Sequence, residues 1–155
     1  MAEDKDALNK QLLDVIFCMK QEGMVDDHFI YVYSLRENTE DPFFLVALIP
    51  EFCSQAREVI NQLTHALNNP LLVSCDTMKE YVYKVKGSAL SLGASRMAQA
   101  FSHFQCAIDN ASQEQCIIAL NQAKHEFTSL EEKLHVIVQG YNVPEIQKAN
   151  LCLLM

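Results

Sequence analysis

The sequence predicts an all-α fold, an antiparallel four-helix bundle with two short helices packed at its N-terminal end. The first observation is that apolar residues recur three and four positions apart over long stretches, which is the period of an amphipathic helix. The second is that the 155 residues include only four glycines and four prolines, the residues that most often interrupt helices. The third is that short connections join the long stretches, which favours antiparallel neighbours.

The first two helices are predicted over residues 5–22 and from about residue 26 to residue 36. Gly23 follows the first helix as a C-terminal stop, and Asp26 or Asp27 provides the N-cap of the second. The inward face of the first helix is formed by Leu8, Leu12, Ile16 and Met19.

The third helix is predicted to begin at a strong start signal and to be distorted near its beginning. Asp41 caps it, and Pro42 occupies the first helical position, where proline is favoured. The helix continues to about Leu67. Pro50 lies inside it and removes one backbone hydrogen bond, which predicts a kink near Val46.

The last three helices show the clearest apolar faces. The fourth is predicted over residues 75–92, where Gly93 ends it, and the fifth over residues 95–110. Ser112 and Gln115 form a capping-box pattern that starts the last helix. The inward faces are formed by Met78, Val82, Val85, Ala89 and Leu92 on the fourth helix, by Met97, Phe101, Phe104 and Ile108 on the fifth, and by Cys116, Leu120, Ala123, Phe127, Leu130, Leu134 and Ile137 on the last.

The composition limits the partners that the chain is expected to bind. The net charge is −8 and no run of lysine and arginine occurs, which argues against nucleic acid and against an acidic membrane surface. The charged N-terminus does not resemble a secretory signal, and the longest apolar run, residues 43–49, is too short to span a bilayer. At this length we expect one helical domain at residues 1–139 and a C-terminal tail at residues 140–155.

The sequence contains no motif that predicts an enzyme, a metal site or a cofactor. The six cysteines include no CxxC pair, and several lie on apolar faces, which favours reduced thiols in an intracellular protein. His103 and Cys106 are the closest histidine–cysteine pair, and two ligands do not make a zinc site. P-loop, GxGxxG and GxSxG patterns do not occur.

The most informative segment is the side of the fourth helix opposite its apolar face. There Tyr83 is flanked by Lys86 and Gly87, because residues three and four apart are neighbours on a helix surface. Leu90 lies on the same side. A glycine inside a helix costs about 1 kcal/mol relative to alanine. An exposed glycine here therefore predicts the close approach of another molecule.

This segment resembles the signature of plant histidine-containing phosphotransfer proteins, in which a histidine is followed by an aliphatic residue, Lys-Gly-Ser and a small-residue run that ends in Gly-Ala. The matching residues are Val85, Lys86, Gly87, Ser88, Ser91, Gly93 and Ala94. Weaker similarity at residues 21–27, 41–44 and 125–130 extends the resemblance along most of the chain. The resemblance implies that Lys86 lies beside the phosphate and that Gly87 opens space for the partner's aspartate.

The position of the phosphoryl-accepting histidine is occupied by Tyr83, and the glutamine usual beside it is replaced by Lys84. A neutral imidazole is a nitrogen nucleophile near neutral pH, whereas a phenol with a pKa of about 10 is protonated. The phenol is a poor nucleophile without a positioned base, and its phosphate ester is too stable for a reversible relay. The resemblance therefore implies a pseudo-phosphotransfer protein, whose docking surface has lost its chemistry.

By the same resemblance, the expected partners are receiver domains of hybrid histidine kinases and response regulators. Lys79, Lys84 and Lys86 make the fourth helix locally basic, which suits the acidic pocket of such a partner. Leu90 and Leu35 are candidate apolar contacts, with partial core burial as an equally weighted alternative. The resemblance implies a monomer, expected in the cytoplasm and nucleus, that dampens a cytokinin-type phosphorelay.

Two alternatives remain open from the sequence. The chain could be an active phosphocarrier that uses another residue, although no histidine is followed by Lys-Gly at the required spacing. The histidines are His28, His65, His103, His125 and His135. It could also be a lipid-anchored helical adaptor, because residues 152–155 fit the C-a-a-X farnesylation pattern. No polybasic segment precedes Cys152 to secure an anchor, so an unmodified apolar tail is favoured and membrane binding is expected only if Cys152 is prenylated.

Overall fold

The computed structural model describes residues 2–38, 44–71, 74–110 and 112–142, and the side chains of residues 10–34, 47–71, 74–110 and 112–139. The described residues form six helices and no strand, which confirms the all-α prediction. The helices are α1 (Ala2–Gln21), α2 (Asp27–Asn38), α3 (Phe44–Asn68), α4 (Cys75–Leu92), α5 (Ser95–Asp109) and α6 (Gln113–Asn142).

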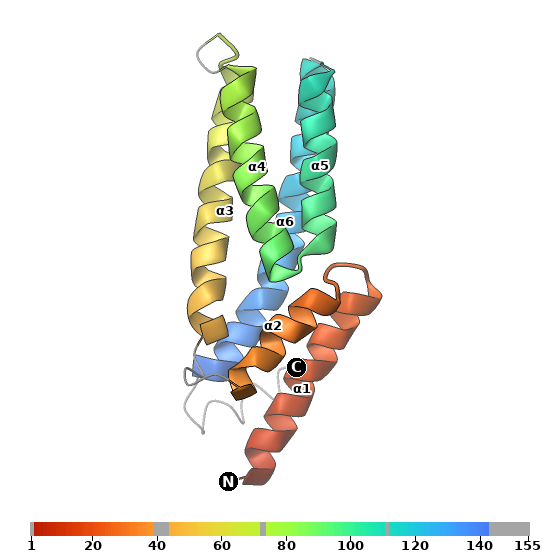
Figure 1. Cartoon of the computed structure of the whole chain (residues 1–155), viewed down its shortest axis with the longest axis vertical. Helices are drawn as coiled ribbons and strands as arrows, with labels where there is room; N and C mark the ends of the chain where they lie inside the picture. The colour runs from red at the N-terminus through yellow and green to blue at the C-terminus, as the bar shows by residue number, and fades with distance from the viewer. Residues whose placement is uncertain (1, 39–43, 72–73, 111, 143–155) are drawn as a thin grey trace.

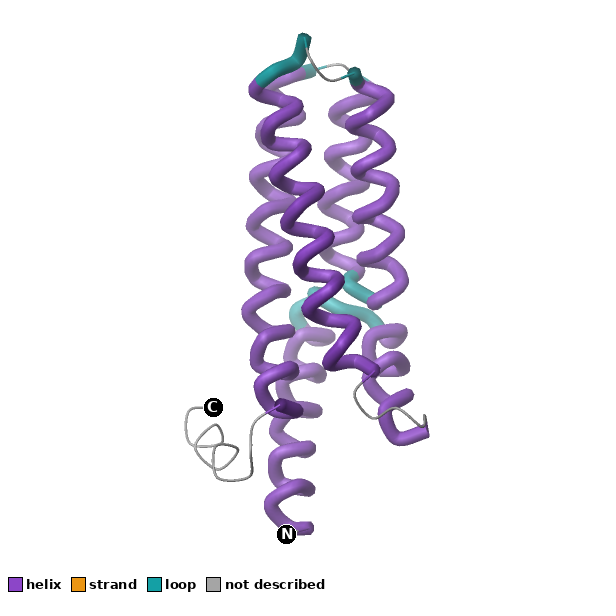
Figure 2. The backbone as a smooth tube through the Cα atoms, turned by 90° about the vertical axis from the view of Figure 1, so that its left-hand side faces the viewer, coloured by secondary structure: helices purple, strands orange, loops and turns teal. Residues whose placement is uncertain are grey.

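Four of these helices form an antiparallel bundle, as predicted (Figure 1). α3 and α5 run in one direction, and α4 and α6 run in the other. The ring closes because α3 packs on α4, α4 on α5, α5 on α6 and α6 on α3. Figure 2 shows the same four helices side by side along the long axis of the molecule.

α1 and α2 continue the bundle beyond the turn that joins α4 to α5 (Figure 1). α1 packs on α6, and α2 packs on α3 and α4. The two longest helices, α3 and α6, are therefore covered by α4 and α5 at one end and by α2 and α1 at the other. The expectation of two short N-terminal helices is correct only for α2, with 12 residues, because α1 has 20 residues and is longer than α4 with 18.

One apolar core runs through the bundle, and no polar or charged side chain is buried among the described ones. Every residue of the inward faces predicted for α4, α5 and α6 is buried. On α1, Leu12, Ile16 and Met19 are buried, while Leu8 lies outside the described side chains. The helical period of the sequence therefore predicted the core-facing sides correctly.

The five cysteines with described side chains are free thiols, and they divide into two groups. Cys53 and Cys116 are buried, and burial raises the pKa of both thiols, to about 11 for Cys53. Cys18, Cys75 and Cys106 are exposed. The expectation that several thiols lie on apolar faces holds for the first group, whereas the helix sides that carry the second group face solvent.

Capping side chains lie where the sequence predicts them at two helix starts. Asp26, rather than Asp27, caps α2, because its Oδ1 accepts the backbone N–H groups of His28 at 2.9 Å and Phe29 at 3.4 Å. Ser112 caps α6 in the same way, with 3.3 Å between its Oγ and the backbone nitrogen three residues later. Both starts therefore satisfy backbone N–H groups that have no partner inside the helix.

Other helix ends differ from the sequence predictions or lie outside the described residues. α3 continues through the exposed Pro50, and the kink predicted there stays a prediction. The predicted cap at Asp41 and Pro42 lies outside the described residues, as does Cys152. α6 ends at Asn142, so it continues for three residues into the predicted tail. None of the described helices is long and apolar enough to cross a membrane.

Candidate functional site

α4 is held in place at both ends. At its start, the Ser74 Oγ accepts the backbone N–H of Thr77 at 3.2 Å. At its end, Gly93 adopts a left-handed conformation with φ of 90° and donates its N–H to the carbonyl groups of Ala89 and Leu90. The caps fix where the helix begins and ends.

The turn after α4 is joined to the start of α2. The carbonyl oxygen of Gly93 accepts the backbone N–H of Asp26 at 3.0 Å. A Cβ on Gly93 would lie 2.4 Å from the backbone nitrogen of Phe29 and 2.8 Å from the Asp26 Oδ1. Glycine is therefore required here both by its positive φ and by the close approach of α2.

The solvent side of α4 carries four residues that the sequence predicts for docking, and we call the surface of Tyr83, Lys86, Gly87 and Leu90 the α4 face. Tyr83 is 77% exposed and Leu90 is 53% exposed, so the alternative of core burial is wrong for Leu90. A Cβ on Gly87 would meet no atom within 4 Å. No contact with the described part of the chain therefore requires a glycine at this helical position.

The lysines of α4 that flank Tyr83 have different surroundings. The Lys79 Nζ lies 2.9 Å from the Asp109 Oδ1 on α5. The hydrogen bond from this ammonium to Asp109, together with the charge of that carboxylate, raises the pKa of Lys79. Lys86 is partly exposed and has no ion-pair partner within the described part of the chain. Lys86 is therefore the uncompensated cation of the α4 face, whereas the charge of Lys79 is balanced by its neighbour.

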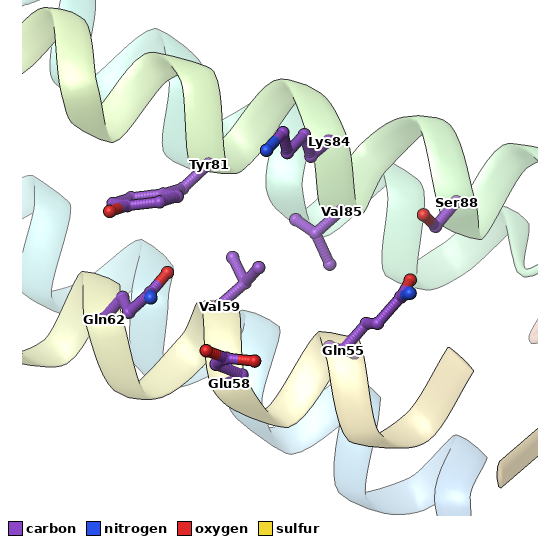
Figure 3. Close-up of a pocket in the computed structure, with 9 residues that line it drawn as sticks. Gln55, Glu58, Val59, Gln62, Tyr81, Lys84, Val85 and Ser88 are labelled. Carbon is purple, nitrogen blue, oxygen red and sulfur yellow. The ribbon is translucent and has the colours of Figure 1, made fainter. Parts of the chain in front are cut away.

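Lys84 lies on the flank of α4 rather than at the centre of the α4 face. It follows Tyr83 by one residue, a rotation of about 100° around the helix. It lines a groove of about 510 Å³ between α4 and α3. Figure 3 shows Lys84 and Tyr81 on the α4 wall of this groove, opposite Gln62 and Glu58 on the α3 wall. A partner that covers the α4 face would therefore meet Lys84 only at its edge.

α2 adds two exposed rings beside the α4 face, and the sequence analysis did not select either of them for docking. The His28 Nε2 lies 2.9 Å from the carbonyl oxygen of Ser91 in the last turn of α4. The ring of His28 is 6.1 Å from that of Tyr31, which is 58% exposed. No local pattern reveals this placement, because it depends on the contact between α2 and α4. Leu35, the predicted contact on α2, lies outside the described side chains.

The α4 face carries no assembled nucleophile in the described part of the chain. Tyr83 has no hydrogen-bond partner there that could serve as a base, and a phenol needs one to attack phosphorus. The five histidines lie on α2, α3, α5 and α6 rather than on α4. No cluster of three or more His, Cys, Asp or Glu side chains able to hold a metal ion occurs among the described residues.

The six-helix fold, with a Lys-Gly pair on the open side of α4, agrees with the resemblance to histidine-containing phosphotransfer proteins. No protein-family model matches the chain. The chain is 29% identical over 133 residues to histidine-containing phosphotransfer protein 2 of rice, covering 86% of this chain and 89% of the relative. The crystal structure of a histidine-containing phosphotransfer protein from maize matches with a TM-score of 0.80 and 29% identity, covering 86% of this chain and 96% of that one. The chain is a homologue of the plant histidine-containing phosphotransfer proteins and shares their helical bundle.

Two further homologues are named as pseudo forms. Pseudo histidine-containing phosphotransfer protein 1 of rice is 24% identical over 135 residues, covering 87% of this chain and 71% of the relative. Pseudo histidine-containing phosphotransfer protein 6 of Arabidopsis thaliana is 20% identical over 134 residues and covers 86% of both chains. The homologues therefore include histidine phosphotransfer proteins and proteins named as their pseudo counterparts.

Proposed function

We propose that this chain is a pseudo-histidine phosphotransfer protein. It docks receiver domains of hybrid histidine kinases and response regulators, accepts no phosphate, and dampens a cytokinin-type phosphorelay in the cytoplasm and nucleus. One observation carries the proposal. Tyr83 is exposed beside Lys86 and Gly87, at the position where the resemblance places the phosphoryl-accepting histidine.

The chemistry of Tyr83 supports docking without transfer. A protonated phenol donates and accepts hydrogen bonds but is a poor nucleophile toward phosphorus unless a base removes its proton. Transfer to oxygen would also form a phosphate ester, which does not return its phosphate to an aspartate as a phosphoramidate does. A tyrosine here therefore ends the relay at the point where a histidine would continue it.

The composition of the surface supports an acidic partner. Lys86 offers an uncompensated positive charge beside Tyr83, and complementary charge accelerates and orients docking. Leu90 and Tyr31 provide exposed apolar and aromatic area, and docking surfaces combine such a centre with a polar rim. Gly87 leaves room for the partner's backbone or side chains to approach the helix.

Dampening follows from occupancy alone. A receiver domain bound to this chain is unavailable to a protein that accepts phosphate, so the flux through the relay falls in proportion to the fraction bound. The reduction depends on the concentration of this chain relative to the dissociation constant, and no catalytic step is needed.

The decisive experiment is phosphoryl transfer from a receiver domain that carries labelled phosphate. We expect the wild-type chain to stay unlabelled and Tyr83→His, alone or with Lys84→Gln, to gain acid-labile label. Tyr31→His is the matched control, because it places a histidine at another exposed tyrosine that has no Lys-Gly pair after it. It is expected to stay unlabelled.

The other results separate the remaining functions. Acid-labile label on the wild-type chain would overturn the proposal in favour of an active phosphocarrier that uses another residue. A wild-type chain that binds no receiver domain in a direct binding assay, combined with an unlabelled Tyr83→His variant, would reject docking itself.

A further inference from the structure

The ion pair between Lys79 and Asp109 differs from the ion pairs that join the other helices of the bundle. Those between α3 and α6 and between α5 and α6 each contain a carboxylate side chain that is only 19% or 15% exposed. In the pair between α4 and α5, the side chains of Lys79 and Asp109 are 42% and 54% exposed. Ion pairs as exposed as this add little to stability. The pair therefore contributes little to holding α4 against α5.

The position of the pair connects it to the α4 face. Lys79 precedes Tyr83 by four residues, so the two side chains are neighbours with Cβ atoms about 5–6 Å apart. Asp109 lies across the seam in the last turn of α5. Charges at the surface act over about 8 Å at physiological salt. Both charges of the pair therefore act on any anionic group that a partner places against Tyr83.

We propose that Asp109 is a specificity-determining residue of the α4 face, because it holds Lys79 in an ion pair and leaves Lys86, with Lys84 at the edge of the face, as the cations offered to an anionic partner. The inference rests on the proposed function, in which an acidic receiver domain docks on this face. It adds a residue on α5, outside the segment that carries the resemblance. A partner carboxylate or phosphate that reaches Lys79 must compete with Asp109, so Asp109 weakens docking and favours partners that engage Lys86.

The charges predict opposite effects for the two members of the pair. Asp109→Asn keeps the size of the side chain and releases Lys79, so binding of an anionic partner should tighten by about two- to fivefold, more at low salt than at high salt. Lys79→Gln leaves the Asp109 carboxylate unbalanced beside the α4 face, so binding should weaken by a similar factor. The double variant should bind more weakly than the wild-type chain, because removal of Asp109 releases no cation when Lys79 is absent.

Two probes test the inference. Binding of a receiver domain depends on the proposed function, whereas binding of inorganic phosphate does not. The first is the dissociation constant of an unphosphorylated receiver domain that binds the wild-type chain. The second is inorganic phosphate, followed through the amide NMR shifts of α4 residues 79–90. Glu132→Gln is the matched control, because it makes the same change in net charge at an exposed position on α6, diagonally across the bundle from α4. Circular dichroism and thermal midpoints verify that each variant keeps the wild-type fold.

The results separate a local effect from a global one. A gain with Asp109→Asn that exceeds the gain with Glu132→Gln, and that shrinks in the Lys79→Gln background, supports the inference. Equal gains in affinity for Asp109→Asn and Glu132→Gln would mean that only net charge matters. No gain for Asp109→Asn would mean that Asp109 does not control this face. Each of these two results would overturn the inference. If no receiver domain binds the wild-type chain, the proposed function fails, and the phosphate titration still decides the role of Asp109.

Discussion

Gly93 and Gly87 belong to the same signature, yet the structure gives them opposite surroundings. Gly93 has a φ of 90°, and a Cβ there would lie 2.4 Å from the backbone nitrogen of Phe29. Gly87 lies within the regular helix α4, and a Cβ there would meet no atom within 4 Å. The fold requires the first glycine. It keeps the second at a cost of about 1 kcal/mol relative to alanine.

The contrast divides α4 into a structural end at Gly93 and a middle around Gly87, which we call the docking middle because the proposed function places the partner there. A residue that lowers stability and has no contact to explain it points to a molecule outside the chain. A residue whose replacement would clash with the backbone of another helix is required by the fold. The resemblance to phosphotransfer proteins covers both glycines, so it cannot separate these roles, whereas the geometry around each Cα does.

The largest effect is expected at the structural end. Gly93→Ala should lower the free energy of unfolding by about 3 kcal/mol, because alanine at a positive φ is strained and its Cβ must displace the start of α2. Urea denaturation measures the change. Gly23→Ala is the control, because Gly23 also has a positive φ, of 77°, with open space around it, and should lose only about 1 kcal/mol. Equal losses of unfolding free energy in Gly93→Ala and Gly23→Ala would show that the contact with Phe29 relaxes. The approach of α2 to the end of α4 would then not be the reason for glycine at position 93.

The next effect is expected across the same junction, on α2. Asp26→Ala should lower the free energy of unfolding by about 1–2 kcal/mol, because it removes the acceptor of two backbone N–H groups at the start of α2. Asp27→Ala should change it by about 0.5 kcal/mol or less, since that side chain forms only an exposed ion pair with Lys20. Chemical denaturation of both variants checks the assignment. A larger loss at Asp27 would contradict it.

The sequence predicted the features of this region that depend on local period and local caps. The buried residues of α4 follow a strict three-and-four spacing, which directs them to one side of the helix. Gly93 ends the helix as a positive-φ residue, as a glycine after an apolar period usually does. The rotation of Lys84 away from Tyr83 was also available from the helical period, because each residue is rotated by about 100° from the one before it.

The features that the sequence could not supply are contacts between segments far apart in the chain. The approach of Phe29 to Gly93 depends on how α2 crosses the end of α4. The pairing of Lys79 with Asp109 depends on the register of α4 against α5, and no pattern within either helix encodes it. The open space at Gly87 has the same origin, since the composition of α4 does not show that no neighbouring element covers it.

At the docking middle the effect on stability should change sign. Gly87→Ala should raise the free energy of unfolding by about 1 kcal/mol, because it removes the helix cost of glycine without meeting any atom. The same change should weaken receiver binding by at least about tenfold, equal to about 1.4 kcal/mol, if a partner approaches the helix closely there. Ser88→Ala, at the neighbouring position that faces the groove, is the control and should leave binding unchanged. A more stable Gly87→Ala chain that binds as well as wild type would remove the reason for assigning this glycine to docking.

The smallest change in stability is expected at the apolar edge of the α4 face. Leu90→Ala should alter the free energy of unfolding by about 0.5 kcal/mol or less, because the side chain is 53% exposed. Leu92→Ala, two residues later and 2% exposed, should cost about 2–5 kcal/mol. Receiver binding should weaken a few-fold for Leu90→Ala, since exposed apolar contacts at an interface act without supporting the fold. If Leu90→Ala and Leu92→Ala instead lowered the free energy of unfolding by similar amounts, Leu90 would belong to the core. The docking middle of α4 would then be reduced to Tyr83, Lys86 and Gly87.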